Sequence, residues 1–317
     1  MKIAIIFSGQ GAQTPGMGRS IYESSAAAKE WFDRAGDHIK HLCFDADEQT
    51  LGQTLNTQPA VYAMSMAAYA ALKERLDKMD IAPAMFAGHS LGEYSALTTA
   101  GHIPASAGAA LIQRRAGLMS EAAAGGMCAV IADAATTLRL CSQAAEHGMI
   151  LPVNYNAPKQ TVVAGEQKAL EAFIALAAER GVRAVPLKVS GAFHSPMMES
   201  AYQGLKEYLK EVPAGTPMAP VYCNVDGKPY NNGIPQSDIP ENIRALLALQ
   251  VKSPVRWVDT IQNMAADGAD IFIEVGVGRV QSGLIRKINR ELKVLSVTDG
   301  PSLDETVNIL KQEMQNA

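Results

Sequence analysis

The pentapeptide Gly88-His89-Ser90-Leu91-Gly92 constrains the fold more than any other part of the sequence. The apolar residues Ala84–Ala87 before it predict a strand, and the helix-forming residues Leu91–Ala100 after it predict a helix. A serine in such a turn lies at a tight corner, with its hydroxyl clear of the backbone and the next amide pointing into the same space. The bare motif also fits a tight turn with a surface serine. Its placement favours a nucleophile and half of an oxyanion hole, and therefore acyl transfer chemistry.

The composition argues against several classes of function. With 317 residues and 48% hydrophobic content, the chain can bury a large core. A net charge of −4 disfavours nucleic acid or an anionic membrane as the main partner. No apolar run approaches the roughly 18 residues that a membrane span needs. The cysteines are scattered without metal-binding spacing, which favours a reduced, cytoplasmic compartment.

The order of the predicted elements indicates an α/β architecture. Strands at Lys2–Phe7 and Ala84–Ala87 alternate with a helix at Tyr22–Ala35 and an apolar helix at Ala60–Leu76, which Pro59 is expected to begin. Such alternation is typical of a wound parallel sheet. This part of the chain is expected to resume later with a helix and two strands, at Ser195–Val212, Val221–Val225 and Ile271–Glu274.

The pattern between residues 125 and 193 differs from the rest. Its elements are expected in the order β-α-β-β-α-β, which is the ferredoxin-like arrangement. The four strands and two helices are predicted at Met127–Ala132, Ala134–His147, Leu151–Asn154, Gln160–Ala164, Gln167–Arg180 and Ala184–Val189. We therefore expect residues 125–193 to form a small subdomain inserted into a larger one of residues 1–124 and 194–317.

His194 is the best candidate for a general base. It follows the last predicted strand of the insertion, at the seam between the two expected subdomains, where it could deprotonate a neighbouring nucleophile. A loop histidine bonded to solvent is the alternative. No acidic third member can be assigned, because Asp133 is the only aspartate between Ser90 and His194 and no glutamate there ends a main-sheet strand. Either another kind of group orients the base, which we prefer, or the chain is not an ordinary hydrolase.

The helix predicted from Ser106 carries a cation within its apolar stripe. Arg115 falls inside this stripe and Arg114 at its edge; the apolar members are Ala107, Leu111, Leu118 and Ala122. A guanidinium directed inward must meet an anion or remain an unpaired charge, at a cost of several kcal/mol. A structural ion pair or a snorkelling side chain is one interpretation. The other is a bidentate clamp for a substrate carboxylate.

Several separated motifs together point to one family. They are Phe7-Ser8-Gly9-Gln10-Gly11-Ala12-Gln13, Thr57-Gln58-Pro59-Ala60, Gly88–Tyr94, Arg115, Asn154-Tyr155-Asn156, Gly191–Ser195, Gln250 and Glu274-Val275-Gly276. Over nearly its full length the chain resembles malonyl-CoA:acyl carrier protein transacylases, and also the acyltransferase domains of polyketide synthases. The resemblance implies an α/β-hydrolase-like large subdomain with a parallel-sheet core and the inserted ferredoxin-like subdomain. It implies no cofactor and no metal.

The resemblance also implies the reaction centre. Ser90 would be the nucleophile and His194 its general base. The main-chain carbonyl of Gln250 would orient the imidazole, which would account for the missing acid. Gln10 and the amide of Leu91 would form the oxyanion hole. In a ping-pong reaction, Ser90 would take malonyl from coenzyme A and release it to the phosphopantetheine thiol of a carrier protein, for fatty acid or polyketide synthesis.

Four further residues would bind substrate by the same resemblance. Arg115 would hold the malonyl carboxylate, and Phe193 matches members that select malonyl over methyl-branched groups. Asn154 and Asn156 would line the pantetheine channel, although a structural turn role fits them equally well. Two departures from the family pattern are Ser8 and Val277, which stand where proline is usual and loosen the turns that carry them.

The expected partner is an acidic, phosphopantetheinylated carrier protein, which calls for a basic docking patch. The candidates are Lys188, Arg286, Lys287 and Arg290; an ordinary solvated helix face is the alternative. Neither nucleic acid nor membrane is expected as a partner, and a monomer suffices.

Three other functions remain open at this point. One is a hydrolase that clears acyl groups from carrier proteins, which Arg115 disfavours because it would retain malonate rather than neutral chains. Another is a non-catalytic module that binds a carrier protein or coenzyme A. That module would leave the joint presence of Ser90, His194 and Gln10 unexplained. A generic carboxylesterase is the most distant alternative.

Overall fold

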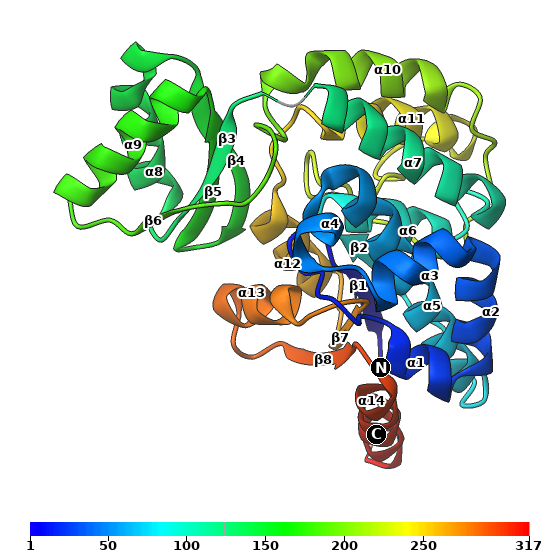
Figure 1. Ribbon diagram of the computed structural model, residues 1–317. Coiled ribbons are helices and arrows are strands. Elements are labelled where there is room, and N and C mark those ends of the chain that lie inside the picture. Colours follow the sequence, from blue (N-terminus) through cyan, green and yellow to red (C-terminus); the bar gives the residue numbers. More distant parts are fainter. Residues whose placement is uncertain (123, 317) are drawn as a thin grey trace. The chain divides into compact units, whose positions relative to one another are not determined.

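The computed structural model describes residues 1–122 and 124–316 (Figure 1). The chain divides into two compact units. The first unit takes Met1–Gln113, Pro213–Tyr222 and the chain from Asn263 onward. The second takes Arg114–Val212 and Cys223–Gln262. Helices α7 (Ala105–Glu121) and α12 (Trp257–Ala266) contribute residues to both units.

The first unit is built on a four-stranded parallel sheet, which confirms the predicted α/β core. The strand order is β2-β1-β7-β8, with strands at Ile3–Phe7 (β1), Met85–Gly88 (β2), Ile271–Val275 (β7) and Lys293–Val297 (β8). Strands β1, β2 and β7 are buried along their whole length, as expected of a parallel sheet covered on both faces. Phe7 is in register with both Gly88 and Val275, so the residues that follow these three strands emerge at one edge. Ligands usually bind at this edge of a parallel sheet.

The helices of the first unit lie between these strands in the sequence, except α14, which follows β8 (Figure 1). They are α1 (Arg19–Ser24), α2 (Ala26–Ala35), α3 (Asp37–Phe44), α4 (Glu48–Gly52), α5 (Thr54–Asp77), α6 (Leu91–Thr99), α13 (Val280–Ile288) and α14 (Gly300–Gln315). No helix in the described part of the chain is long and apolar enough to cross a bilayer.

Four details of the first unit differ from the sequence predictions. The predicted helix Tyr22–Ala35 is two helices, because the Ser25 side chain caps α2 by accepting from Ala28 N at 3.3 Å. Helix α5 begins at Thr54, and Pro59 lies inside it. Because proline has no amide hydrogen, α5 lacks the bond from position 59 to the carbonyl of Leu55, a residue that is exposed.

The remaining two differences concern strands. The predicted strand at Val221–Val225 is wrong, because Val221 makes only an isolated bridge with Phe86. Strand β8 was not predicted. Its sequence is short and its apolar residues are interrupted by Ser296, so the pattern carries no strong signal for a strand.

The second unit contains an antiparallel sheet in the order β4-β5-β3-β6. Its strands are β3 (Gly126–Val130), β4 (Ile150–Ala157), β5 (Gln160–Gly165) and β6 (Ala184–Pro186), and its helices are α8 (Ala134–Ala144) and α9 (Gln167–Glu179). The strand order and the β-α-β-β-α-β sequence confirm the ferredoxin-like prediction. Buried side chains such as Val130, Leu140 and Phe173 form the core between the sheet and both helices.

The second unit is larger than the predicted insertion of residues 125–193. It also holds part of α7, the loop with His194, and helices α10 (Glu199–Leu209) and α11 (Ile239–Gln250). Helices α10 and α11 pack against each other. Residues implied in the chemistry are therefore divided between the two units.

Candidate active site

Ser90 lies at a strained corner between β2 and α6. Its backbone has φ 51° and ψ −104°, outside the regions that L-residues favour. Among the described residues, Asp80, Ser90 and His194 are the non-glycine positions with positive φ. Such a conformation costs about 1–3 kcal/mol and persists only where the surroundings enforce it. The two residues implied as nucleophile and base both carry this strain.

Close packing explains the glycines on either side of Ser90. A Cβ on Gly88 would lie 1.9 Å from the carbonyl carbon of Gly92. A Cβ on Gly92 would lie 2.3 Å from the carbonyl oxygen of Phe7, at the end of β1. No side chain fits at these separations, so Gly88 is required by the tightness of the turn itself and Gly92 by its packing on the end of β1.

We expect Gly92→Ala to destabilise the protein by about 3 kcal/mol or more, because the added methyl group overpacks the turn. Urea unfolding with wild type and variant measures this difference. Gly283→Ala on α13 is the matched control, because its Cβ meets nothing within 4 Å. Removing this helical glycine should stabilise the fold by about 0.4–1 kcal/mol. Equal stabilities of the two variants would contradict the packing argument.

The two oxyanion-hole candidates, Leu91 and Gln10, belong to the first unit, as does Ser90. The Leu91 amide is the first of α6, and the first amides of a helix have no acceptor within the helix. The side-chain amide of Gln10 donates to Thr54 Oγ1 at 3.2 Å, and the main-chain amide of Gln10 is the other candidate donor of this residue. Its neighbour Gly9 lies close to the turn, since a Cβ there would be 2.5 Å from His89 O.

His194 is buried, with 3% of its surface exposed, and adopts φ 62°. Its Nδ1 lies 2.9 Å from the main-chain oxygen of Gln250, and its own amide donates to Val251 O at 2.9 Å. Because a carbonyl oxygen can only accept, Nδ1 must carry the proton. The neutral ring therefore keeps its lone pair on Nε2, where a general base needs it.

Arg115 is also buried, with 1% of its surface exposed, whereas Arg114 is exposed. Its Nη2 donates to Gln250 Oε1 at 3.1 Å. Gln250 is fully buried and thus serves two groups, the imidazole through its main-chain oxygen and the guanidinium through its side chain. The sequence did not predict this side-chain contact. It depends on where the C-terminal end of α11, which holds Gln250, lies in the fold.

The remaining substrate candidates lie in the second unit. Phe193 is buried next to His194. Asn154 and Asn156 are both 8% exposed on β4, whose pairing with β5 shifts register just before Asn154 and again across Asn156. Within the described residues, Asn154 Oδ1 is a buried acceptor without a hydrogen bond. Such an atom is suited to receive a ligand N–H.

Ser8 and Glu274 form a buried pair that the sequence analysis did not foresee. Ser8 Oγ donates to Glu274 Oε1 at 3.1 Å, and the amides of Gln281 and Ser282 donate to the same carboxyl group at 3.0 and 2.7 Å. Burial raises the pKa of Glu274, and these hydrogen bonds oppose that rise. Val277, the second departure from the family pattern, is buried in the following turn.

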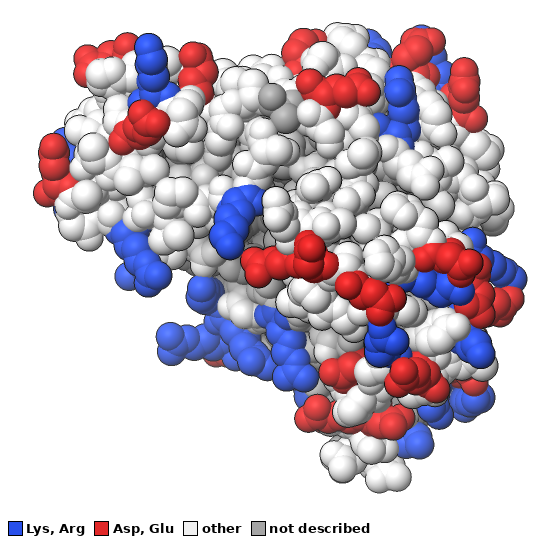
Figure 2. Space-filling model, in the orientation of Figure 1, with Lys and Arg blue, Asp and Glu red and all other residues white. Residues whose placement is uncertain are grey.

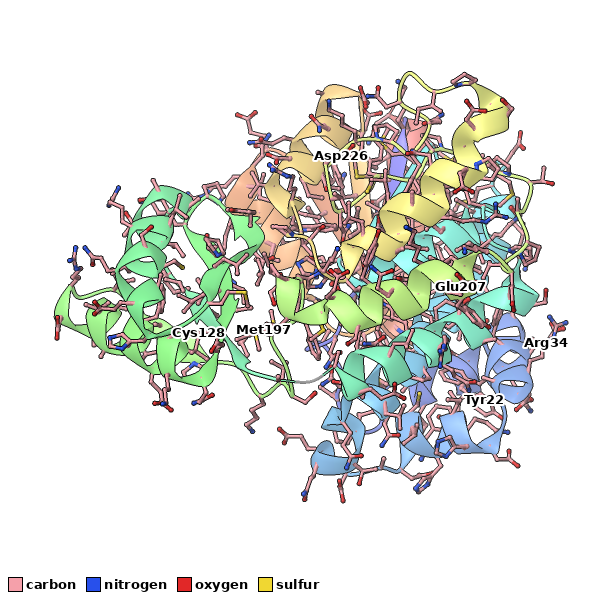
Figure 3. All side chains as sticks on the ribbon, turned by 90° about the horizontal axis from the view of Figure 1, so that it is seen from above. Tyr22, Arg34, Cys128, Met197, Glu207 and Asp226 are labelled. Atoms are coloured by element: carbon pink, nitrogen blue, oxygen red, sulfur yellow. The ribbon has the colours of Figure 1, made fainter. Side chains whose placement is uncertain are left out.

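Three of the four cysteines, Cys43, Cys128 and Cys141, do not compete with Ser90 as nucleophiles. Cys128 lies on β3 of the ferredoxin-like sheet (Figure 3), and burial raises the pKa of its thiol to about 11. Burial likewise raises the pKa values of Cys43 and Cys141 to about 12. These thiols stay protonated near neutral pH, where only a thiolate would react. In the described ranges, no group of histidine, cysteine and acidic side chains could hold a metal ion.

The docking candidates are all exposed. Arg286 and Lys287 lie in the last turn of α13 and Arg290 just beyond it. Figure 2 shows lysine and arginine side chains gathered over the region of α13 and β8. Lys188 follows β6 and belongs to the second unit.

The whole chain is similar to one kind of known protein. The family described as the acyl transferase domain matches residues 4–299. The malonyl CoA-acyl carrier protein transacylase of Bacillus subtilis (strain 168) is 38% identical over 100% of this chain and 99% of its own length. The solved structure of that transacylase from Clostridium perfringens is 34% identical, with a TM-score of 0.89 over 99% of this chain and 98% of its own. A solved complex of a type II PKS acyl-carrier protein with its malonyl-transacylase contains a chain that is 35% identical to this one, with a TM-score of 0.89 over 97% of this chain and 99% of that one.

Proposed function

Because the chain belongs to the acyl transferase domain family, we propose that it transfers a malonyl group from malonyl-CoA to the phosphopantetheine thiol of an acyl carrier protein. The observation that carries this proposal is the double role of Gln250. One buried residue orients a histidine as a base and holds a buried arginine suited to a carboxylate. A general base and a cation that binds the acyl carboxylate are two of the groups that transfer of a carboxylated acyl group uses.

The first half-reaction loads the enzyme. Ser90 Oγ attacks the thioester carbonyl of malonyl-CoA while His194 Nε2 takes the hydroxyl proton. The main-chain amides of Gln10 and Leu91 donate to the tetrahedral oxyanion. Collapse of this intermediate breaks the C–S bond, and the coenzyme A thiolate receives the proton from the imidazolium. The product is a malonyl ester on Ser90.

The second half-reaction runs the same steps in reverse with a new thiol. His194 Nε2 takes the proton of the phosphopantetheine thiol, whose sulfur attacks the malonyl ester. The same two amides stabilise the second tetrahedral intermediate. The C–O bond then breaks, and Ser90 recovers its proton from the imidazolium. The malonyl group leaves as a thioester of the carrier protein.

Each proposed binding residue contacts a different part of the substrate. Arg115 holds the malonyl carboxylate and Phe193 contacts the acyl group. Asn154 Oδ1 accepts a hydrogen bond from a pantetheine amide, and Asn156 lies two residues further along β4. The scattered cysteines of the sequence support a cytoplasmic setting. The proposal involves one copy of the chain, so we propose a monomer.

The direct test combines intact-mass measurement with a choice of acceptors. After mixing with malonyl-CoA, the protein should gain the mass of one malonyl group. Excess phosphopantetheinylated carrier protein should then discharge that adduct as malonyl carrier protein. If no adduct forms, the chain is a binding module. If water remains the main acceptor with carrier present, the chain is a hydrolase.

We propose that Arg286, Lys287 and Arg290, with Lys188 on the second unit, attract the acidic carrier protein. Changing the three residues at α13 to glutamate should lower kcat/KM for the carrier about tenfold at low salt, because electrostatic steering raises association rates. The wild-type rate should fall with added salt, whereas the rate of the variant should vary less.

The control for this experiment is Lys311→Glu, which changes one exposed charge on α14 of the same unit. Rates are measured with carrier protein as the varied substrate and Ser90 already loaded, so that malonyl-CoA binding does not contribute. Equal salt dependence of wild type and the triple variant would show that α13 is not the docking surface.

A further inference from the structure

The loop that carries Gln10 is anchored by a carboxyl group that takes no part in the proposed acyl transfer steps. Glu274, in β7, is fully buried. Its carboxyl group accepts from the hydroxyl of Ser8 and from the first amides of α13, at Gln281 and Ser282. The carboxyl group therefore connects three segments: the end of β7, the start of α13 and the loop after β1.

This anchored loop packs directly on the turn that holds Ser90. A Cβ on Gly9 would lie 2.5 Å from His89 O, and a Cβ on Gly92 would lie 2.9 Å from Ser8 O. The backbone of Ser8 and Gly9 thus contacts both sides of the turn. Any displacement at Ser8 moves Gly9 and Gln10 relative to Leu91, within the same unit of the structure.

The β7–α13 turn also lies near the loop beyond Gln10. A Cβ on Gly278 would lie 3.4 Å from both the Cβ and the main-chain oxygen of Ala12. The loop is thus held before Gln10 by the bond from Ser8 and at Gln10 by the bond from its Nε2 to Thr54. After Gln10 it lies near the β7–α13 turn. Of these supports, the bond from Ser8 is the one made by a buried hydroxyl to a buried carboxyl group.

We propose that Ser8 is a positioning residue of the oxyanion hole. Its hydroxyl, held by Glu274, fixes the loop so that the main-chain amides of Gln10 and Leu91 donate to the same oxygen. The chain thus secures by a hydrogen bond the turn for which its family usually has proline. This inference rests on the proposed function, because it assigns the role of the two amides to acyl transfer.

The expected loss in kcat follows from the part of the oxyanion hole that the bond between Ser8 and Glu274 positions. Removing one oxyanion-hole donor typically lowers kcat about 10²–10³-fold. Ser8→Ala leaves both amides in place and loosens only one of them, so we expect a smaller loss in kcat, about 5–30-fold. The KM for malonyl-CoA should change less than about twofold, because the oxyanion forms only in the transition state.

The experiment measures kcat, KM and thermal stability for Ser8→Ala, Glu274→Gln and the double variant. If Ser8 acts through Glu274, the loss in the double variant should equal that of Glu274→Gln within about twofold rather than multiply. Ser8→Cys fills nearly the same space with a weaker donor and should lose kcat in the same direction. It keeps the test decisive if Ser8→Ala fails to fold.

The matched control is Ser302→Ala, which removes another buried hydroxyl of the same unit. Ser302 Oγ bonds within the first turn of α14 and not with the Gln10 loop. It should lower stability without changing kcat. The proposal is overturned if Ser8→Ala retains wild-type kcat, changes KM alone or behaves like the control. If the wild type itself forms no malonyl ester, the proposed function fails instead, and the two failures are thus distinct.

Discussion

Ser90→Ala should abolish the malonyl adduct and lower the rate of transfer about 10⁴-fold or more, since removing the nucleophile of a serine enzyme has effects of this size. The variant keeps the turn and the two flanking amides, so binding of malonyl-CoA should persist. Intact mass reports the adduct, and stopped assays with carrier protein report the transfer.

Ser95→Ala is the matched control for this variant. Ser95 lies further along α6 and is buried, whereas Ser90 is half-buried at the start of that helix. Its substitution should leave both the adduct and the rate within about twofold of wild type. An adduct that survives Ser90→Ala but disappears in another variant would assign the nucleophile to another residue.

Arg115→Met should reduce kcat/KM for malonyl-CoA by about one to two orders of magnitude more than for acetyl-CoA. A hydrogen bond to a charged group contributes about 1.5–3 kcal/mol, and acetyl has no carboxylate to receive it. Methionine keeps much of the buried volume and so limits a loss of packing. The measurement is the ratio of the two kcat/KM values in wild type and variant.

Two other variants sharpen the interpretation of this ratio. Arg114→Met, at the exposed neighbouring position, should leave the ratio unchanged. Gln250→Leu removes Oε1 but not the main-chain oxygen, so it should lower the malonyl preference in the same direction as Arg115→Met. Equal losses with both acyl groups in Arg115→Met would show that the arginine is structural.

The sequence was sufficient for the features that depend on local patterns. The turn around Ser90 could be predicted because its glycines and its strand–helix context are contiguous. The ferredoxin-like sheet could be predicted because its six elements follow one another without interruption. The burial of Arg115 could be predicted because the helical period of α7 sets which residues share its apolar face.

The features that the sequence did not reveal depend on distant contacts. The hydroxyl of Ser8 and the carboxyl group of Glu274 are far apart in the chain and meet only because β1 and β7 are neighbours in register. The side chain of Gln250 meets Arg115 through the packing of separate segments of the second unit. Pro59 misled the prediction of where α5 begins, because proline is typical of the first turn of a helix and here lies after that turn.

The contact between Gly92 and the end of β1 has a consequence for biosynthesis of the protein. The corner that exposes the hydroxyl can close only once the first strand and the segment after the second strand have found each other. A nascent or partly folded chain therefore presents an ordinary, unreactive serine. Reactivity appears together with tertiary structure, so immature molecules do not consume the cell's activated thioesters.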